Sequence, residues 1–209
     1  MAPKRNATRQ AKKAATREGL KKAAIACFRE GGYAQTRIGN ITKAAGVAQG
    51  TFYVHFPSKE ALLDELLAEF NEGLVARLTP VWLDGTDAAW RERIRHTAET
   101  FLDHWEDNRG FVEIYAERVA AGLTVAALRD GINPEAAGLM TEQLAAFVGA
   151  RGLSPSAALL VVQGLLALWA RIGLQCLFND DVNRDDAVAA LERLTVGALE
   201  GVLPGGGQP

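Results

Sequence analysis

The apolar positions before residue 60 predict three short helices in succession. In the first, five apolar side chains recur at steps of three and four, and a glycine pair ends the pattern. Thr36 is the expected N-cap of the second helix, which ends at Gly46. The third helix covers about 49–56 and stops before Pro57. The apolar faces consist of Leu20, Ala23, Ala24, Cys27 and Phe28, then Ile38, Ile41 and Ala45, then Phe52 and Phe56.

The same helical pattern continues to the end of the chain. Ser58 precedes a long helix that we expect to end near Pro80, and Asp87 precedes the next. Asn133-Pro134 and Ser154-Pro155 each place a cap residue before a proline at the first helical position. No stretch alternates apolar and polar residues as a strand would, so we predict an all-α fold. The other expected helices are 109–121, 125–129 and 185–202, the last with Val188, Leu191, Thr195, Ala198 and Val202 on one side.

The segment Leu159 to Phe178 is apolar and about long enough to cross a bilayer. Gln163, Arg171 and Gln175 interrupt it, and an unpaired arginine inside a membrane span is costly. We therefore expect a helix buried in protein, with no membrane partner.

The two cysteines, Cys27 and Cys176, are too few for a disulfide framework, and both lie in apolar helical patterns. They are expected to be buried thiols in a reducing compartment. Residues 1–22 lack the apolar core of a secretory signal. Together these features predict a cytoplasmic protein.

Charge divides the chain more sharply than its net value of -2 suggests. Residues 1–60 hold twelve Lys and Arg against three Asp and Glu, whereas residues 61–209 hold eleven Arg against twenty-two Asp and Glu. This split indicates that the first part meets a polyanion. Residues 1–15 are basic and lack apolar periodicity, which predicts a flexible arm that either only solubilises the chain or adds phosphate contacts.

The segment from Thr36 to Lys59 has the pattern of two short helices joined by a tight, glycine-containing turn. If Phe52 and Phe56 face inward, the other side of the third helix is polar and carries no acidic residue. Such a surface suits phosphates and base edges in a major groove. The exposed residues would be Gln49, Gly50, Thr51, Tyr53 and His55.

The segment from Thr16 to about Phe70 resembles the DNA-binding domain of the TetR family of bacterial transcriptional repressors. The matching features are Ala23-Ala24, Phe28, Gly32-Tyr33, Ile41, Ala44-Ala45-Gly46-Val47, Gly50-Thr51-Phe52-Tyr53, His55-Phe56, Lys59-Glu60 and Leu62-Leu63. The resemblance covers about a third of the chain, and beyond residue 75 no motif indicates a particular subfamily.

The resemblance also implies roles for individual residues. The residues that would hold the DNA backbone are Thr36, Arg37, Tyr53, His55 and Lys59. The residues that would face the bases are Gln49, Gly50 and Thr51, with Gln49 able to pair with an adenine. Two positions depart from the family: Ala48 stands where a Ser or Thr cap is frequent, and Thr42 replaces a small apolar residue.

The second part of the chain has no strong motif, but aromatic and polar residues alternate there. The resemblance implies a pocket for a small effector, and the residues we select are His104, Trp105, Tyr115 and Trp169. Gln163 or Arg171 would either orient a ligand or, as we favour, form a hydrogen bond across a dimer.

Other chemistry finds little support in the sequence. A metal site can be tried on His96, Glu99, Asp103 and His104. His96 and Glu99 form an i, i+3 pair, but no third ligand follows this pair at a diagnostic spacing, so we expect neither metal nor cofactor. The chain also lacks the nucleophile, zinc-protease, phosphate-loop and dinucleotide motifs, so we do not expect an enzyme.

Two apolar helices, about 155–178 and 185–202, predict a homodimer with a four-helix interface. The expected organisation is an arm (1–15), a helix-turn-helix domain (16–62), an effector-binding and dimerisation domain (63–203) and a flexible tail (204–209). We expect a repressor that a small molecule releases from a palindromic operator. An activator or architectural protein without effector, or a small-molecule-binding helical protein without DNA, remains the alternative.

Overall fold

The computed structural model describes residues 3–83, 90–120 and 153–201. All the elements in these ranges are α-helices, which confirms the predicted all-α fold. They form two compact units. The described residues up to Leu67, together with Gly110–Ala120, make the first, and Ala68–Arg109 with the described residues from Leu153 onward make the second. The expected boundary at residue 62 stays a prediction; the first unit extends to Leu67 and also includes the described residues of α6 from Gly110 onward.

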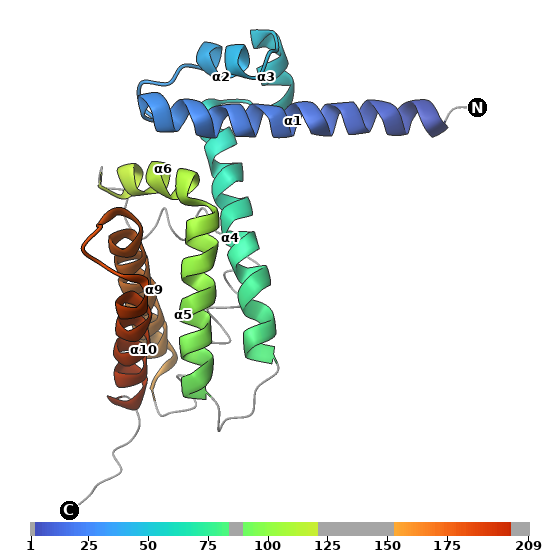
Figure 1. Cartoon of the computed structure of the whole chain (residues 1–209). Helices are drawn as coiled ribbons and strands as arrows, with labels where there is room; N and C mark the ends of the chain where they lie inside the picture. Colours follow the sequence, from blue (N-terminus) through green and yellow to red (C-terminus); the bar gives the residue numbers. More distant parts are fainter. Residues whose placement is uncertain (1–2, 84–89, 121–152, 202–209) are drawn as a thin grey trace, which may run out of the picture. The chain divides into compact units, whose positions relative to one another are not determined.

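The first unit contains α1 (Pro3–Gly31), α2 (Ile38–Ala44), α3 (Gln49–His55), the first turns of α4 (Lys59–Leu83) and α6 (Arg109–Ala120). Figure 1 shows α2 and α3 on the same side of α1. The predicted apolar faces meet in its core, where the fully buried side chains include Leu20, Phe28, Ile41, Phe52, Phe56 and Leu62.

Residues 3–15 differ from the flexible arm expected for them, because α1 begins at Pro3. The segment is rich in Ala, Lys, Arg and Gln, which all favour helix, and no glycine occurs before Gly19. The missing apolar periodicity predicted only that no face would be packed. The structure agrees on that point, since residues 9–15 are all exposed.

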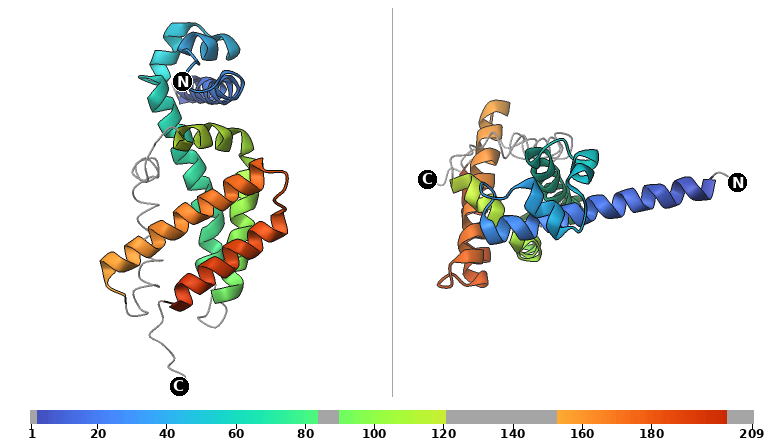
Figure 2. Two further views of the ribbon diagram at one scale, coloured as in Figure 1. Left: turned by 90° about the vertical axis from the view of Figure 1, so that its left-hand side faces the viewer. Right: turned by 90° about the horizontal axis from the view of Figure 1, so that it is seen from above.

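The second unit is built from the later turns of α4 with α5 (Trp90–Asp107), α9 (Pro155–Phe178) and α10 (Arg184–Gly201). Helices α5, α9 and α10 pack against one another, as both views of Figure 2 show. Ser154 caps α9 as predicted, its hydroxyl accepting a hydrogen bond from the Ala157 N–H. Helix α4 continues through Pro80 to Leu83, slightly beyond the expected end near Pro80.

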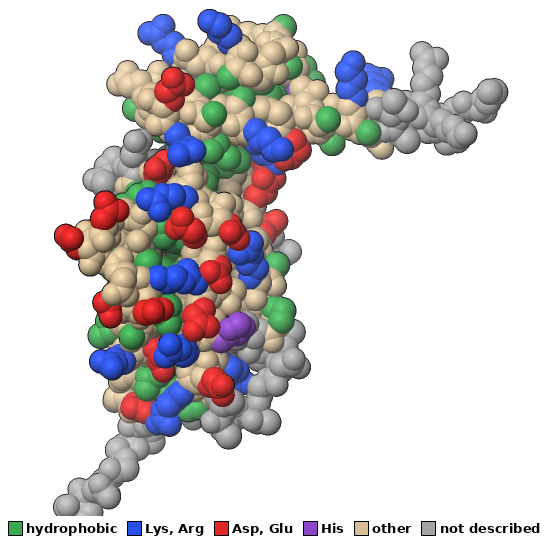
Figure 3. All heavy atoms as spheres, in the orientation of Figure 1, with side chains coloured by type: hydrophobic (Ala, Val, Ile, Leu, Met, Phe, Trp, Pro, Cys, Tyr) green, Lys and Arg blue, Asp and Glu red, His purple; other side chains and the backbone are tan. Residues whose placement is uncertain are grey.

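Cross-helix ion pairs cover one face of the second unit. Figure 3 shows alternating basic and acidic side chains over α5 and α10. The pairs that join the two helices are Arg91–Glu200, Arg95–Glu192 and Arg184–Asp103.

Helix α9 is apolar all round but is buried on one side only. Val162 is 1% exposed and Leu165 8%, whereas Leu160 is 68% and Leu166 49% exposed. In the single chain α9 is therefore covered on one side only, and the expected burial of its other side in a dimer stays a prediction. Of the described helices, α9 is the one long and apolar enough to cross a membrane by length and composition.

Both cysteines are free and half-buried rather than buried, and burial raises the pKa of each thiol. The predicted features around Asp87, 125–129, Asn133-Pro134 and the tail 204–209 lie outside the described residues.

Candidate nucleic-acid interface

A tight turn joins α2 to α3 in the first unit. The Ala45 N–H donates to the Ile41 carbonyl at 2.9 Å, which closes α2, and Val47 N–H donates to the Thr42 carbonyl at 3.0 Å. Gly46 has φ +67°, a left-handed conformation that disfavours residues with a Cβ. The two helices and this turn form the helix-turn-helix that the sequence predicted.

Helix α3 separates an inward side from an outward side. Phe52 is fully buried, and its ring lies 5.7 Å from that of Phe56. On the outward side Tyr53 is 55% exposed and Val54 67% exposed, and Gln49 and Gly50 are also exposed. No residue of α3 is acidic. The outward side therefore presents hydrogen-bonding groups without repelling phosphate, as predicted.

Arg37 ends the connection before α2 and is its N-cap residue, a role we expected of Thr36. The Asn40 side-chain oxygen accepts a hydrogen bond from the Arg37 N–H at 3.0 Å, so the cap uses the backbone of Arg37. Its guanidinium is exposed and makes no ion pair among the described residues. Arg37 is thus free to meet a phosphate.

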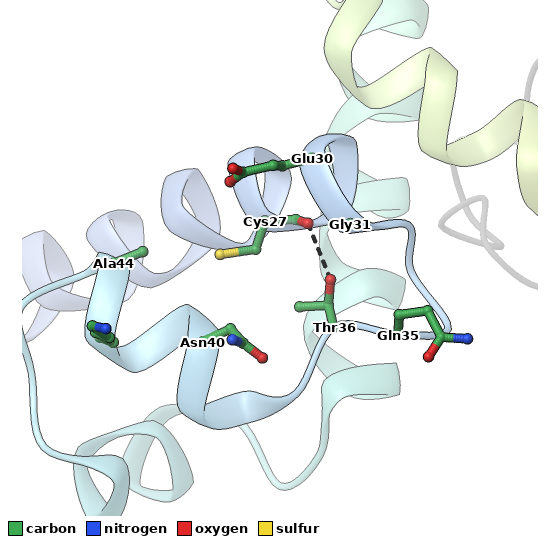
Figure 4. Close-up of a pocket in the computed structure, with 8 residues that line it drawn as sticks. Cys27, Glu30, Gly31, Gln35, Thr36, Asn40 and Ala44 are labelled. Carbon is green, nitrogen blue, oxygen red and sulfur yellow. Dashed lines mark hydrogen bonds between the residues drawn. The ribbon is translucent and has the colours of Figure 1, made fainter.

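Thr36 differs from the backbone-holding residue that the resemblance implied. Its side chain is buried, and its hydroxyl lies 2.8 Å from the Gly32 carbonyl and 3.0 Å from the Cys27 carbonyl. Figure 4 shows the hydroxyl turned toward α1. Thr36 therefore fastens the α1–α2 connection to the end of α1, and its side chain is not available to DNA.

Lys59, the first residue of α4, is largely engaged inside the unit. Its ammonium donates to the carbonyls of Tyr33, at 2.7 Å, and Thr36, at 2.9 Å, and lies 4.2 Å from the centre of the Tyr33 ring. An ammonium has three N–H groups, so one remains. Lys59 positions the 32–36 connection and can still offer one donor outward.

His55, the last residue of α3, is half-buried, and its Nδ1 has no hydrogen-bond partner in the described part of the chain. Burial, with the nearby charges of Arg17 and Lys13, lowers its pKa. The lowered pKa favours the neutral imidazole.

The two departures from the family pattern have local outcomes. Ala48 is the N-cap of α3 and provides no side-chain hydrogen bond, as expected from its methyl group. The Thr42 hydroxyl, which needed a partner, donates to the Gly39 carbonyl at 3.3 Å. Thr51 is half-buried, which limits the part of it that faces outward.

The sequence analysis missed an ionic cluster that joins α1, α3 and α4. Arg17 pairs with Glu65, donates a hydrogen bond to the His55 carbonyl and lies over the Phe56 ring at 4.1 Å. Lys21, only 4% exposed, lies 3.6 Å from Glu65 and 2.5 Å from Glu18. A signal was present: Lys21 interrupts the apolar face of Leu20 and Ala24, and a buried cation requires a carboxylate.

The four residues chosen for an effector do not share one unit. His104, Trp105 and Trp169 belong to the second unit, where the Phe101 ring lies 4.7 Å from Trp105 and 5.4 Å from Trp169. Tyr115 belongs to the first unit, where burial raises its pKa to about 12.

Two of the candidate residues in the second unit form hydrogen bonds within the protein. Trp169 donates its indole N–H to the Thr195 hydroxyl at 2.8 Å, and His104 Nε2 donates to the Phe70 carbonyl at 2.8 Å. Gln163 is half-buried and Arg171 exposed. The described residues contain no group of three or more potential metal ligands, and His96 makes only a 3.8 Å contact with Glu99.

A surface pocket also lies in the first unit. It measures about 560 Å³ and is lined by α1, the 32–36 connection and α2. Cys27 and Glu30 of α1 face Asn40 and Ala44 of α2 across it (Figure 4). None of the residues selected for an effector lines it.

Comparison with known proteins supports the interpretation of the first unit. Residues 20–66 match the family model of the bacterial regulatory proteins of the tetR family. The chain carries a tetR-family domain. The matched residues contain the helix-turn-helix together with Lys21 and Glu65 of the ionic cluster. The chain is also 36% identical over 101 residues to the HTH-type transcriptional repressor KstR2 of Mycobacterium tuberculosis. That match covers 47% of this chain and 50% of KstR2, so the chain spans about half the length of this relative.

Solved structures extend the likeness to the whole fold. A putative TetR-family transcriptional regulator from Syntrophomonas wolfei has a TM-score of 0.68 at 19% identity, covering 91% of this chain and 98% of that one. FadR of Bacillus subtilis in complex with stearoyl-CoA has a TM-score of 0.61 at 21% identity, covering 90% and 98%. The described helices beyond the tetR-family domain therefore have the fold of these regulators.

Proposed function

We propose that the protein is a sequence-specific DNA-binding transcriptional regulator, and specifically a repressor released by a small-molecule effector. The observation that carries the proposal is the outward side of α3 in the tetR-family domain. That side is exposed, carries hydrogen-bonding groups and has no acidic residue, while Phe52 on the opposite side is fully buried. The related proteins named above are regulators and not enzymes, and we propose no catalytic role.

We assign the DNA contacts to polar groups that the domain leaves available on its surface. Gln49 and Gly50 at the start of α3 face the bases, with the Gln49 amide able to pair with N6 and N7 of an adenine. Arg37 and Tyr53 contact phosphates, and Lys59 adds the donor that its internal bonds leave free. Thr36 supports the site from inside.

The exposed apolar side of α9 supports the homodimer. Leu160 and Leu166 on α9 and Leu194 on α10 are each about half exposed or more, which is unusual for leucines on a soluble chain that stands alone. A partner copy covering 155–178 and 185–202 would bury them and would place two copies of α3 about 34 Å apart, in successive major grooves. The two-fold symmetry of such a dimer would require a palindromic operator. The DNA target implies a cytoplasmic location. Burial in the dimer would explain why α9 is apolar without a membrane.

The effector site is proposed for the second unit, around His104, Trp105 and Trp169. Release requires that the effector bind the two states of the dimer with different affinity, typically by ~1–3 kcal/mol. The stearoyl-CoA bound to FadR, a protein of this fold, makes acyl-CoA compounds a first set to test.

Selection of bound duplexes from a random pool tests the DNA role. We expect an inverted repeat whose half-site centres lie one helical turn apart, and release of that duplex by at least one candidate effector. Enrichment without symmetry would exclude the dimeric arrangement. Binding that no effector releases would favour an effector-independent activator or architectural protein. No enrichment at all would favour a helical small-molecule-binding protein without a DNA role.

A further inference from the structure

The N-terminal half of α1 is longer than packing requires. Leu20 is the first fully buried side chain of the helix, and residues 9–15 before it are all exposed. The view from above in Figure 2 shows α1 continuing past α2 and α3. An unpacked helical run of this length is marginally stable in water, so a binding partner would be needed to hold it firmly.

The charges of this extension are not compensated. Arg9, Lys12 and Lys13 make no ion pair among the described residues, and no acidic residue precedes Glu18 in the sequence. By contrast, Arg17, Lys21 and Arg29 further along α1 each pair with a carboxylate. The unpaired cations therefore favour an anionic partner.

Helical geometry places two of these cations on the side of α1 that faces α3. Arg17 contacts the carbonyl of His55 at the end of α3. At about 100° per residue, Lys13 and Arg9 lie within roughly 80° of Arg17 around the helix, whereas Lys12 and Lys22 lie about 140° away. The charge of Lys13, and not that of Lys12, lowers the pKa of His55, which agrees with this placement.

We propose that the side of α1 carrying Arg9 and Lys13 is a second DNA-backbone surface, which binds phosphates flanking the half-site contacted by α3. This proposal rests on the proposed DNA-binding function. The occupant is duplex DNA because Arg17, on the same side of α1, contacts the end of α3, and the surface is basic with no acidic residue before Glu18. Arg9 and Lys13 lie about 6 Å apart along the axis, which corresponds to about two phosphates of one strand at about 3.4 Å each.

Two variants test this surface. Arg9→Gln/Lys13→Gln removes the two charges of the proposed side, and Lys22→Gln removes a charge that lies about 180° from Lys13 around the same helix. Glutamine has a helix propensity close to that of Lys and Arg, so both variants should keep α1. Affinity for the selected operator is measured over a series of salt concentrations, together with the footprint on the DNA.

For Arg9→Gln/Lys13→Gln we expect the slope of log affinity against log salt to fall by about 1.8, close to 0.9 for each lost phosphate contact. Protection should disappear at the outer edges of the footprint, while the preferred bases stay the same. Lys22→Gln should leave both unchanged. Equal effects of the two variants, or no effect of either, would overturn the second surface while leaving operator binding by α3 intact. Absence of sequence-selective binding by the wild-type chain would instead overturn the proposed function and the surface with it.

Discussion

Arg17 of α1 donates a hydrogen bond to the carbonyl oxygen of His55, the last residue of α3. The same guanidinium pairs with Glu65 of α4, its Nε lying 2.8 Å from the carboxylate. One side chain thus joins three helices and satisfies a carbonyl at the end of α3 that has no partner in the helix itself. The orientation of α3 depends on this cluster as well as on its buried phenylalanines.

The hydrogen bond from Arg17 holds the pKa of Glu65 below its ordinary value near 4.5. A lowered folded pKa stabilises the protein above the unfolded value, and this contribution disappears as pH falls through the folded pKa. We expect Glu65→Gln to lower the free energy of unfolding by about 1 kcal/mol at pH 7. The difference from wild type should shrink below about pH 4.5. Denaturation across this range is the measurement, and a difference that stays constant with pH would contradict the assigned pairing.

Lys59→Ala removes two hydrogen bonds that hold the 32–36 connection. We expect a loss of about 2 kcal/mol in unfolding free energy, because charged donors to carbonyls are stronger than neutral ones. Operator affinity should fall as well, since Arg37 follows this connection directly. Lys43→Ala is the matched control, because the Lys43 side chain is exposed and forms no described hydrogen bond or ion pair. Similar denaturation midpoints for both variants would show that Lys59 acts only on DNA.

Gln49→Ala should relax the choice of base at one position in each half-site, at a cost of about 1–3 kcal/mol for the preferred base. Its exposed position at the start of α3 means that stability should stay within about 0.5 kcal/mol. Repeating the duplex selection with the variant checks this, and an unchanged preference at every position would remove Gln49 as a base-contacting residue.

Gly173→Ala should destabilise the second unit. A Cβ there would lie 2.9 Å from Trp105 Cε3 and 3.0 Å from Phe101 Cε1, and neither ring can move without displacing its neighbours. Overpacking of this kind typically costs about 1–3 kcal/mol. Gly19→Ala in α1 has nothing within 4 Å and should instead gain up to about 1 kcal/mol. Thermal unfolding of the two variants separates these effects, and a gain from both would show that α9 and α5 pack more loosely than described.

The pKa of His104 is lowered mainly by burial, against the hydrogen bond to Phe70 that raises it, while Arg77 lowers it and Asp107 raises it. Protonation would add an N–H at Nδ1, which has no partner in the described part of the unit. Stability should therefore be complete above about pH 6.5 and decline as pH falls below it. His104→Gln retains a donor for Phe70 without titrating, so its decline should be shallower, although His55 still contributes in the same direction. Parallel pH profiles would contradict this account.

Periodicity predicted the helices whose faces are packed, because those faces repeat at helical spacing. Periodicity failed where tertiary contacts or intrinsic helix propensity determine the local structure. Thr36 has the chemistry of an N-cap, yet its hydroxyl bonds to the end of α1, a partner that no local pattern reveals. Residues 3–15 are helical by propensity alone.

Among the site residues, the outward side of α3 was predictable because Phe52 and Phe56 define the opposite side. The positions of Lys59 and Arg17 were not, since each binds main-chain carbonyls far away in the sequence. Nor could the sequence show that Tyr115 lies in a different unit from Trp169, because that division depends on how α6 packs.

The helices around α3 are joined mainly by hydrogen bonds to carbonyl oxygens and by buried aromatic rings. By contrast, the Gln49 side chain forms no described hydrogen bond, and Gly50 has no side chain. Residues that support the fold are thus separated from those that would choose the bases. Substitutions at 49 and 50 need not be compensated elsewhere, so target preference can drift during evolution, or be redesigned, without loss of folding.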